Sequence, residues 1–181
     1  MARVAEVRRE DLTPRQQEVY DDIMRTRPRK VMTGPFSVWI HTPEIAENAD
    51  RLVNCFRTNP SLDRRLLELI ILMMCRSASV NYAWAVHEPL ALKEGLTQAT
   101  IDAIRARREP VFERDDERLI YDFVTELLQT KTVTAATFER AKSALGLEAV
   151  IETVTCAGFY GMVGYVLNVF DIPQQSGPPL P

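Results

Sequence analysis

The residues best suited to chemistry lie between positions 62 and 95, where a strongly apolar segment holds one carboxylate and is followed by one imidazole. Glu68 is flanked by apolar residues at positions 66, 67 and 69 to 75. A carboxylate with so little access to water must pair with a charge, share a hydrogen bond or stay protonated. Together with His87 it is a candidate for general acid–base chemistry, in which a positioned side chain gives or takes a proton.

Each of these residues also has a structural interpretation that the sequence leaves open. Arg64 and Arg65 stand four and three residues before Glu68 and could pair with it as a plain ion pair. His87 could be a hydrogen-bonded core histidine. Arg76 lies roughly 12 Å from Glu68 along the same predicted helix, at 1.5 Å per residue, so it could bind an anionic substrate or form an ion pair at an interface.

The surroundings of His87 add two aromatic residues and a proline. Tyr82 and Trp84 are predicted to be substrate-pocket walls or core aromatics. Pro89 either begins a new helix or kinks a continuing one, which places His87 near a break. His41 precedes a predicted helix start and is expected at the surface. Two histidines so far apart, with no carboxylate cluster between them, make a poor ligand set, so no metal site is predicted.

The elements that must position these groups are helices, because no segment alternates in the manner of a strand. The pattern predicts an all-α protein. Threonine and proline mark helix starts at positions 13–14 and 42–43, and Gly95 ends the segment that carries His87. Further helices are expected over 97–108, 116–129, 134–145 and 147–170, and residues 27–41 are predicted to be the longest loop, one that could cross an active site.

The last predicted helix is the most apolar, with no charged residue from Thr153 to Phe170. Its length falls short of the ~20 apolar residues of a membrane span, and Thr155 and Asn168 interrupt it, so a soluble helix is predicted. Three glycines recur every third residue and could serve close helix packing or keep a ligand cavity open. An apolar helix of this kind must be covered, which favours a homo-oligomer. The glycines are Gly158, Gly161 and Gly164.

Length and composition predict one cytoplasmic domain over residues 1–181, with an N-terminal arm (1–12) and a proline-rich tail (172–181). The 181 residues suffice for a sizeable core. A net charge of −3, without a basic stripe, argues against a nucleic-acid partner. No secretory signal opens the chain. Cys55, Cys75 and Cys156 each sit in an apolar helical pattern and are predicted to be core thiols in a reducing compartment.

The spacing from Glu68 to His87 resembles the alkylhydroperoxidase-D (AhpD) and carboxymuconolactone decarboxylase superfamily. Its redox branch carries Glu, eleven residues, Cys-x-x-Cys, three residues, His. In this chain the acid and the imidazole match, but Val80 and Ala83 occupy the two cysteine positions. The chain is similar to the non-redox branch in Gly34-Pro35-Phe36, His41-Thr42-Pro43-Glu44, Tyr82-x-Trp84-x-x-His87-Glu88-Pro89 and Gly95-Leu96.

The resemblance implies a multi-helix bundle that assembles as a trimer, or as a hexamer built from trimers, and works without a cofactor. It implies an enzyme that acts on a small carboxylated lactone or related organic acid. His87 would be the proton donor or base, Glu68 would set its state, and Arg76 would hold the substrate carboxylate. The alternative is a non-catalytic oligomeric binding protein on the same scaffold. Peroxidase or disulfide reductase activity is disfavoured, because that chemistry needs both thiols.

Overall fold

The structure is a computed structural model that describes residues 2–26, 31–174 and 177–181. These residues form nine α-helices and one short 3-10 helix and contain no β-strand, which confirms the all-α prediction. The helices are η1 (Arg9–Asp11), α1 (Pro14–Thr26), α2 (Pro35–Trp39), α3 (Pro43–Thr58), α4 (Arg64–Ser77), α5 (Asn81–Lys93), α6 (Gln98–Arg105), α7 (Asp115–Thr130), α8 (Ala135–Leu145) and α9 (Leu147–Val169).

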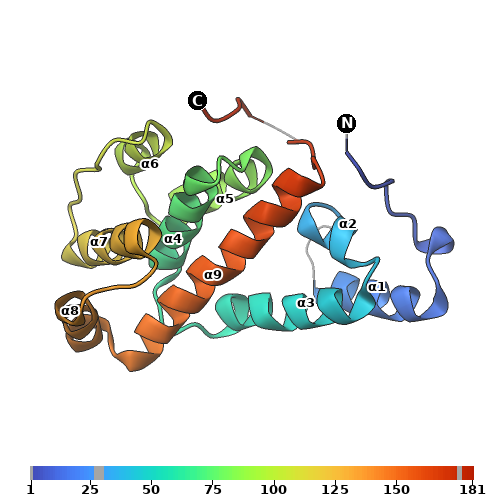
Figure 1. Cartoon of the computed structure of the whole chain (residues 1–181), viewed down its shortest axis with the longest axis horizontal. Helices are drawn as coiled ribbons and strands as arrows, with labels where there is room; N and C mark the ends of the chain where they lie inside the picture. The colour runs from blue at the N-terminus through green and yellow to red at the C-terminus, as the bar shows by residue number, and fades with distance from the viewer. Residues whose placement is uncertain (1, 27–30, 175–176) are drawn as a thin grey trace.

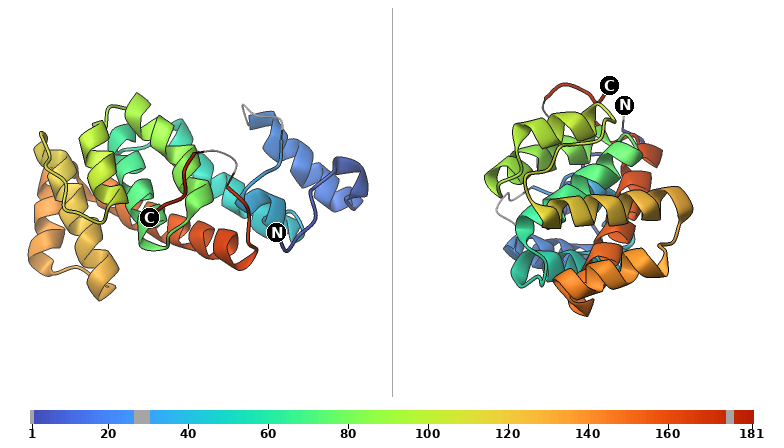
Figure 2. Two further views of the ribbon diagram at one scale, coloured as in Figure 1. Left: turned by 90° about the horizontal axis from the view of Figure 1, so that it is seen from above. Right: turned by 90° about the vertical axis from the view of Figure 1, so that its left-hand side faces the viewer.

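Helix α4 lies at the centre of the fold and packs against α5, α7 and α9. Figure 1 shows α9 crossing one face diagonally, with α1, α2 and α3 towards one end of the molecule and α6, α7 and α8 towards the other. Seen from above in Figure 2, α9 runs along one edge, so one of its sides is turned outwards. The main hydrophobic core follows α4, and a smaller cluster lies between α7, α8 and α9.

Side-chain caps begin several helices, and the cap at Thr13 lies where the sequence predicts a helix start. At α1, the backbone N–H of Thr13 donates to Gln16 Oε1 over 2.9 Å, and the N–H of Gln16 donates to Thr13 Oγ1 over 3.4 Å, which makes a capping box. At α4, the Asp63 carboxylate accepts from the N–H of Arg65. Each cap satisfies backbone donors that have no partner inside the helix.

One local prediction is wrong, and one open alternative is decided. Within the predicted loop 27–41, residues 35–39 form α2, while residues 27–30 lie outside the described residues. Gly34 has φ of 65°, and Pro35 occupies the first turn, where it needs no N–H donor. Of the two alternatives for Pro89, the structure has the continuing helix, because α5 runs through Pro89 to Lys93 and no new helix begins there.

Helix α9 is long and apolar enough, by length and composition alone, to cross a membrane. Half of its most apolar window (50%) is nevertheless buried inside the protein, against α4 and α8. A long apolar helix that supplies one wall of a core passes the same test of composition. Within the described residues, α9 is therefore a core helix with one exposed side.

Both terminal segments lie against the chain's own helices. The N–H of Arg3 donates to the carbonyl of Phe170 over 2.9 Å, at the end of α9. In the proline-rich tail, the N–H of Leu180 donates to Asn81 Oδ1 over 2.7 Å, and Leu180 packs partly buried against the main core.

Candidate functional site

Three helices bring together a carboxylate, an imidazole and a phenol. Glu68 on α4 lies with its Oε2 2.8 Å from His87 Nδ1, on α5. The hydroxyl of Tyr160, on α9, lies 3.2 Å from His87 Nε2. The side chains of Glu68 and His87 are each 14% exposed, and Tyr160 is buried. The predicted Glu68–His87 pair is therefore present in the structure, and it continues into a third group.

The geometry assigns a direction to this chain of hydrogen bonds. When Glu68 is ionised it only accepts, so His87 Nδ1 carries the proton. In the neutral imidazole, Nε2 is then the acceptor and the Tyr160 O–H donates to it. The two rings meet edge to face, with centroids 5.1 Å apart and planes at 89°, so packing as well as hydrogen bonding holds the imidazole in place.

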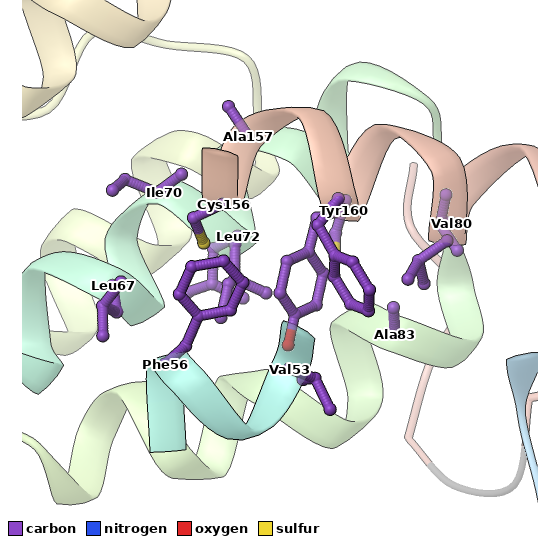
Figure 3. Close-up of a cluster of buried hydrophobic side chains, with 14 of the residues drawn as sticks. Val53, Phe56, Leu67, Ile70, Leu72, Val80, Ala83, Cys156, Ala157 and Tyr160 are labelled. Carbon is purple, nitrogen blue, oxygen red and sulfur yellow. The ribbon is translucent and has the colours of Figure 1, made fainter. Parts of the chain in front are cut away.

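Tyr160 is the site residue that the sequence did not reveal. Figure 3 shows its ring between α9 and α3, with the hydroxyl turned towards Val53. Burial raises the pKa of this phenol well above its ordinary value, and the charge of Glu68 adds to the effect, while Arg57 on α3 acts in the opposite direction. Tyr160 therefore keeps its proton at neutral pH. Its only signal in the sequence is a polar ring within the uncharged segment from Thr153 to Phe170.

The plain ion-pair interpretation of Glu68 does not hold. Arg65 directs its guanidinium away from Glu68, with Nη1 2.6 Å from Glu117 Oε1 and Nη2 2.7 Å from Asp116 Oδ2. Arg64 donates to the backbone carbonyl of Arg57. Both arginines are committed elsewhere, so Glu68 takes His87 as its partner.

Arg76 was expected to flank the same cavity as Glu68 and His87, and the structure does not bring it there. Its guanidinium donates from Nε to the carbonyl of Arg105 over 2.6 Å and from Nη2 to that of Pro181 over 2.7 Å. Arg76 lies in the last turn of α4, and its side chain extends to α6 and to the tail. Burial lowers the pKa of Arg76, and the nearby charge of Arg107 adds to this.

The two predicted aromatic residues have different surroundings. Trp84 is a fully buried core residue, whose Nε1 donates to Glu88 Oε2 over 3.0 Å. The guanidinium of Arg105 lies 5.4 Å from the centroid of its ring. Tyr82 is partly buried and lines a cavity of about 380 Å³ beside the start of α5 and the end of α9. It also fills the space next to Gly34, where a Cβ atom would lie 2.6 Å from its ring.

Apolar residues occupy the two positions that hold cysteines in the redox branch. Val80 and Ala83 are both buried, and a Cβ added at Gly164 would lie 3.1 Å from Val80 Cγ2. Close packing is thus the use of Gly164 within the chain. Cys75 and Cys156 are buried as predicted, and burial raises the pKa of both thiols, with a further contribution from Glu68. Cys55 is exposed, which corrects its placement in the core.

No group of three metal-binding side chains occurs within the described residues. His41 is exposed, as expected. A larger cavity, of about 630 Å³ and lined by residues between 109 and 118, contains none of the predicted site residues. The site thus rests on Glu68, His87 and Tyr160, whose chemistry is proton transfer.

The fold and the site define an all-α protein of the AhpD-like type, with an acid–imidazole pair between α4 and α5 and no thiol pair beside it. Residues 43–116 match the model of the Carboxymuconolactone decarboxylase family, so the chain is similar to this family over that segment. The match spans α3 to α6 and contains both Glu68 and His87, but not Tyr160.

Two solved structures share the fold. One is a protein of unknown function from Agrobacterium tumefaciens, described as a candidate antioxidant defence protein AhpD; it is 16% identical, with a TM-score of 0.68, over 80% of this chain and 100% of that one. The other is a cysteine-to-alanine variant of the debrominase Bmp8 in complex with 2,3,4-tribromopyrrole; it is 16% identical, with a TM-score of 0.73, over 96% of this chain and 91% of that one. No curated protein sequence matches the chain.

Proposed function

We propose that the protein is a carboxymuconolactone-decarboxylase-like enzyme that acts on a small carboxylated lactone or related organic acid by cofactor-free acid–base chemistry. The observation that carries this proposal is the hydrogen-bonded chain Glu68–His87–Tyr160. A carboxylate that orients an imidazole, which in turn contacts a hydroxyl, is an arrangement that moves a proton to or from a reacting atom. The match of residues 43–116 to the Carboxymuconolactone decarboxylase family supports the reaction class.

The residues can carry out the reaction as follows. The substrate carboxylate leaves as CO₂, and its bonding electron pair stays on carbon, delocalised into the lactone carbonyl. With His87 protonated, Nε2–H donates to the Tyr160 oxygen, so the Tyr160 O–H is free to donate to that carbon. As the carbon takes this proton, Tyr160 regains one from His87. His87 then takes a proton from water, so each turnover consumes one proton, and Glu68 stabilises the imidazolium before transfer.

We place the cation for the substrate carboxylate at Arg57 instead of Arg76. Arg57 is exposed on α3 and near enough to Tyr160 to influence the pKa of its hydroxyl. Its side chain is open to solvent, whereas Arg76 is buried and already donates to two backbone carbonyls. An arginine holds a carboxylate through paired N–H donors, which would orient the bond that breaks.

The debrominase with a bound tribromopyrrole supports the proposal, since a protein of the same fold binds a small ring compound. The competing function is a binding protein that keeps the scaffold without turnover. The low exposure of Glu68, His87 and Tyr160 favours that reading, because it leaves a substrate little room. We also propose that the protein works in the cytoplasm.

The test is CO₂ release from a panel of small carboxylated lactones and related unsaturated acids, measured with the wild type and with His87→Ala. We expect turnover of at least one acid, and a loss of about 10²–10⁴ in rate in the variant, the usual contribution of a positioned acid–base group. The melting temperature should stay close to that of the wild type. Saturable binding of an acid without CO₂ release would instead support the binding protein, and a loss below about fivefold would return His87 to a structural role.

A further inference from the structure

The C-terminal ends of α4 and α6 are each capped by an arginine of the other element. Arg76, in the last turn of α4, donates from Nε to the carbonyl of Arg105 over 2.6 Å. Arg107, just after α6, donates from Nη2 to the carbonyl of Arg76 over 3.1 Å. Both guanidiniums also donate to the Ser79 hydroxyl, over 3.3 Å from Arg76 and 3.2 Å from Arg107. We call Arg76, Ser79 and Arg107 the arginine cluster.

The positive charge of the arginine cluster exceeds the negative charge around it. Within the described residues, neither Arg76 nor Arg107 forms an ion pair with an acid, and the nearby Glu88 contacts Arg105 and Trp84 instead. The C-terminal end of a helix carries about half a negative charge, so two helix ends offset about one of the two positive charges. Arg76 is only 7% exposed, and an unbalanced charge is costly when it is buried. The cluster therefore lacks about one negative charge.

Two members of the cluster hold a backbone conformation that favours glycine. Ser79 has φ of 51° and Arg107 has φ of 54°, and each lies just beyond the end of its helix, where glycine is the commonest residue. Residues in strained conformations gather at functional sites. Glycine at these two positions would remove the hydroxyl and the guanidinium that contact Arg76, so the strain is the condition for assembling the cluster.

The tail lies where a counter-ion would bind. Arg76 Nη2 donates to the carbonyl of Pro181 over 2.7 Å, and the N–H of Leu180 donates to Asn81 Oδ1 over 2.7 Å. A backbone carbonyl accepts a hydrogen bond but carries only a partial charge. The Ser79 hydroxyl accepts from both guanidiniums, which leaves its O–H as a donor. Arg76 and Ser79 thus offer hydrogen-bond donors that an anion can take in place of the tail.

A cavity beside the cluster can hold the body of a small ligand. Ser79 and Asn81 line the cavity of about 380 Å³ described above, together with the apolar side chains of Val80 and Leu167 and with Tyr82. Pockets for small molecules have volumes of about 300–1,000 Å³ and combine apolar walls with a few polar groups that fix the orientation of the ligand. Ser79 is exposed, so a ligand can reach this edge of the cavity from solvent.

We propose that Arg76, Ser79 and Arg107 form a binding site for the carboxylate of a small organic acid, and that the tail occupies this site until the acid displaces it. One carboxylate supplies the one negative charge that the cluster lacks, and its two oxygens match the paired N–H donors of a guanidinium. Of the two carbonyls that Arg76 contacts, that of Pro181 is the one that leaves.

The tail is then a competitor that belongs to the chain itself. Binding of the acid releases residues 177–181 from the start of α5, because the tail and the acid use the same donor of Arg76. None of the residues of the arginine cluster belongs to the Glu68–His87–Tyr160 chain, so the inference does not depend on the proposed reaction.

The first experiment measures the binding of benzoate by isothermal titration calorimetry at constant ionic strength, with benzamide as the uncharged analogue. Benzoate should bind a chain that lacks residues 177–181 about tenfold more tightly than the full chain, which corresponds to a tail that is docked about 90% of the time. Benzamide should bind neither chain. The melting temperature checks that the shortened chain is folded. Equal affinity of the two chains for benzoate, or no binding to the shortened chain, would overturn the proposal.

The second experiment places benzoate on the cluster and keeps the full chain. Arg107→Gln removes an exposed charge, so the fold should persist, and benzoate should bind about tenfold more weakly, as expected for the loss of a charged hydrogen bond. Arg108→Gln, at the adjacent exposed position, is the matched control and should bind as the wild type does. Arg57→Gln should also bind as the wild type does. If Arg57→Gln weakens binding and Arg107→Gln does not, benzoate occupies the proposed reaction site, and the site at the arginine cluster is refuted while the proposed function stands.

The third experiment follows the tail by nuclear magnetic resonance of the wild type. The amide signal of Leu180 should shift as benzoate is added, since its hydrogen bond to Asn81 is lost when the tail leaves. The amide signal of Ser79 should shift over the same range of benzoate concentration. A shift at Ser79 with an unmoved Leu180 would show that the acid and the tail bind independently, which contradicts the proposal.

Discussion

Two charged side chains one turn apart on α4 have opposite surroundings. Arg65 is almost fully buried and contacts two carboxylates, those of Asp116 and Glu117, both on α7. Glu68 is partly exposed and contacts a single imidazole, which contacts a phenol. The first cluster fixes α4 to α7, and the second joins α4 to α5 and α9.

The difference lies in what each cluster can do with a proton. Arg65 keeps its charge at every accessible pH, and its guanidinium donates one hydrogen bond to each of the two carboxylates. This cluster therefore has no proton to exchange near neutral pH. An imidazole can both give and take a proton through its two ring nitrogens, and His87 lies between an acceptor and a donor. We interpret the Arg65 cluster as structural and the Glu68 cluster as the site of proton transfer.

Breaking the structural cluster should give the largest effect. Arg65→Met leaves the Glu117 carboxylate buried without its partner, which costs about 3–5 kcal/mol when a buried ion pair is broken. Because domains are stable by only about 5–15 kcal/mol, the variant should be strongly destabilised in urea unfolding. Any folded fraction should retain the activity of the wild type per folded molecule.

The control for this variant removes all three charges. Arg65→Met with Asp116→Asn and Glu117→Gln leaves no buried ion, so much of the lost stability should return. If Arg65→Met alone unfolds at the same urea concentration as the wild type, the cluster does not hold α4 to α7.

The second prediction concerns the proton-transfer cluster. Glu68→Gln keeps the shape of the side chain but can donate to His87 Nδ1, which favours the tautomer with the proton on Nε2. The substrate acid identified with the wild type should then be consumed about 10²–10⁴ times more slowly, while the urea midpoint changes little. Activity within a few-fold of the wild type would show that Glu68 does not set the state of His87.

The sequence predicted much of the helical framework and one of the two contacts of His87. The cap at Thr13 acts locally, so it can be predicted from a few adjacent residues. The Glu68–His87 contact was predictable because its spacing resembles a family pattern. The Tyr160 contact joins positions 73 apart and depends on how α9 packs on α4, which no local pattern encodes.

The wrong predictions for Arg76 and Cys55 also come from contacts between helices that a local pattern does not encode. Arg76 was placed near the site by its position along the helix, but its partners are backbone carbonyls of α6 and the tail, and backbone acceptors leave no trace in the residue types. Cys55 follows an apolar pattern, yet lies on the outer side of α3. Periodicity predicts that a helix has a buried face but does not fix its edges.

The third prediction sharpens the role of Tyr160. Tyr160→Phe keeps the ring packing against His87 but removes the hydroxyl, so kcat should fall about a hundredfold, the lower end of the contribution of a positioned acid, with little change in KM. Loss of one buried hydrogen bond should cost only about 0.5–1.5 kcal/mol of stability. Tyr121→Phe, in a partly buried tyrosine on α7, is the matched control and should leave kcat unchanged. Equal kcat values for the two variants would remove Tyr160 from the reaction.

The smallest expected effect is the absence of thiol chemistry. Val80 and Ala83 replace the two reactive cysteines, and burial keeps Cys75 and Cys156 as protonated thiols by raising the pKa of each. Since the thiolate is the nucleophile, only the exposed Cys55 should react with a thiol reagent in the native protein, against three cysteines in the unfolded chain. Peroxide-dependent oxidation of an added dithiol should proceed at the same rate with the wild type, Cys75→Ser and Cys55→Ser. A faster rate in the wild type than in Cys75→Ser would mean that a buried thiol beside Glu68 reaches peroxide, and the Glu68 cluster would then have to be reinterpreted as a redox site.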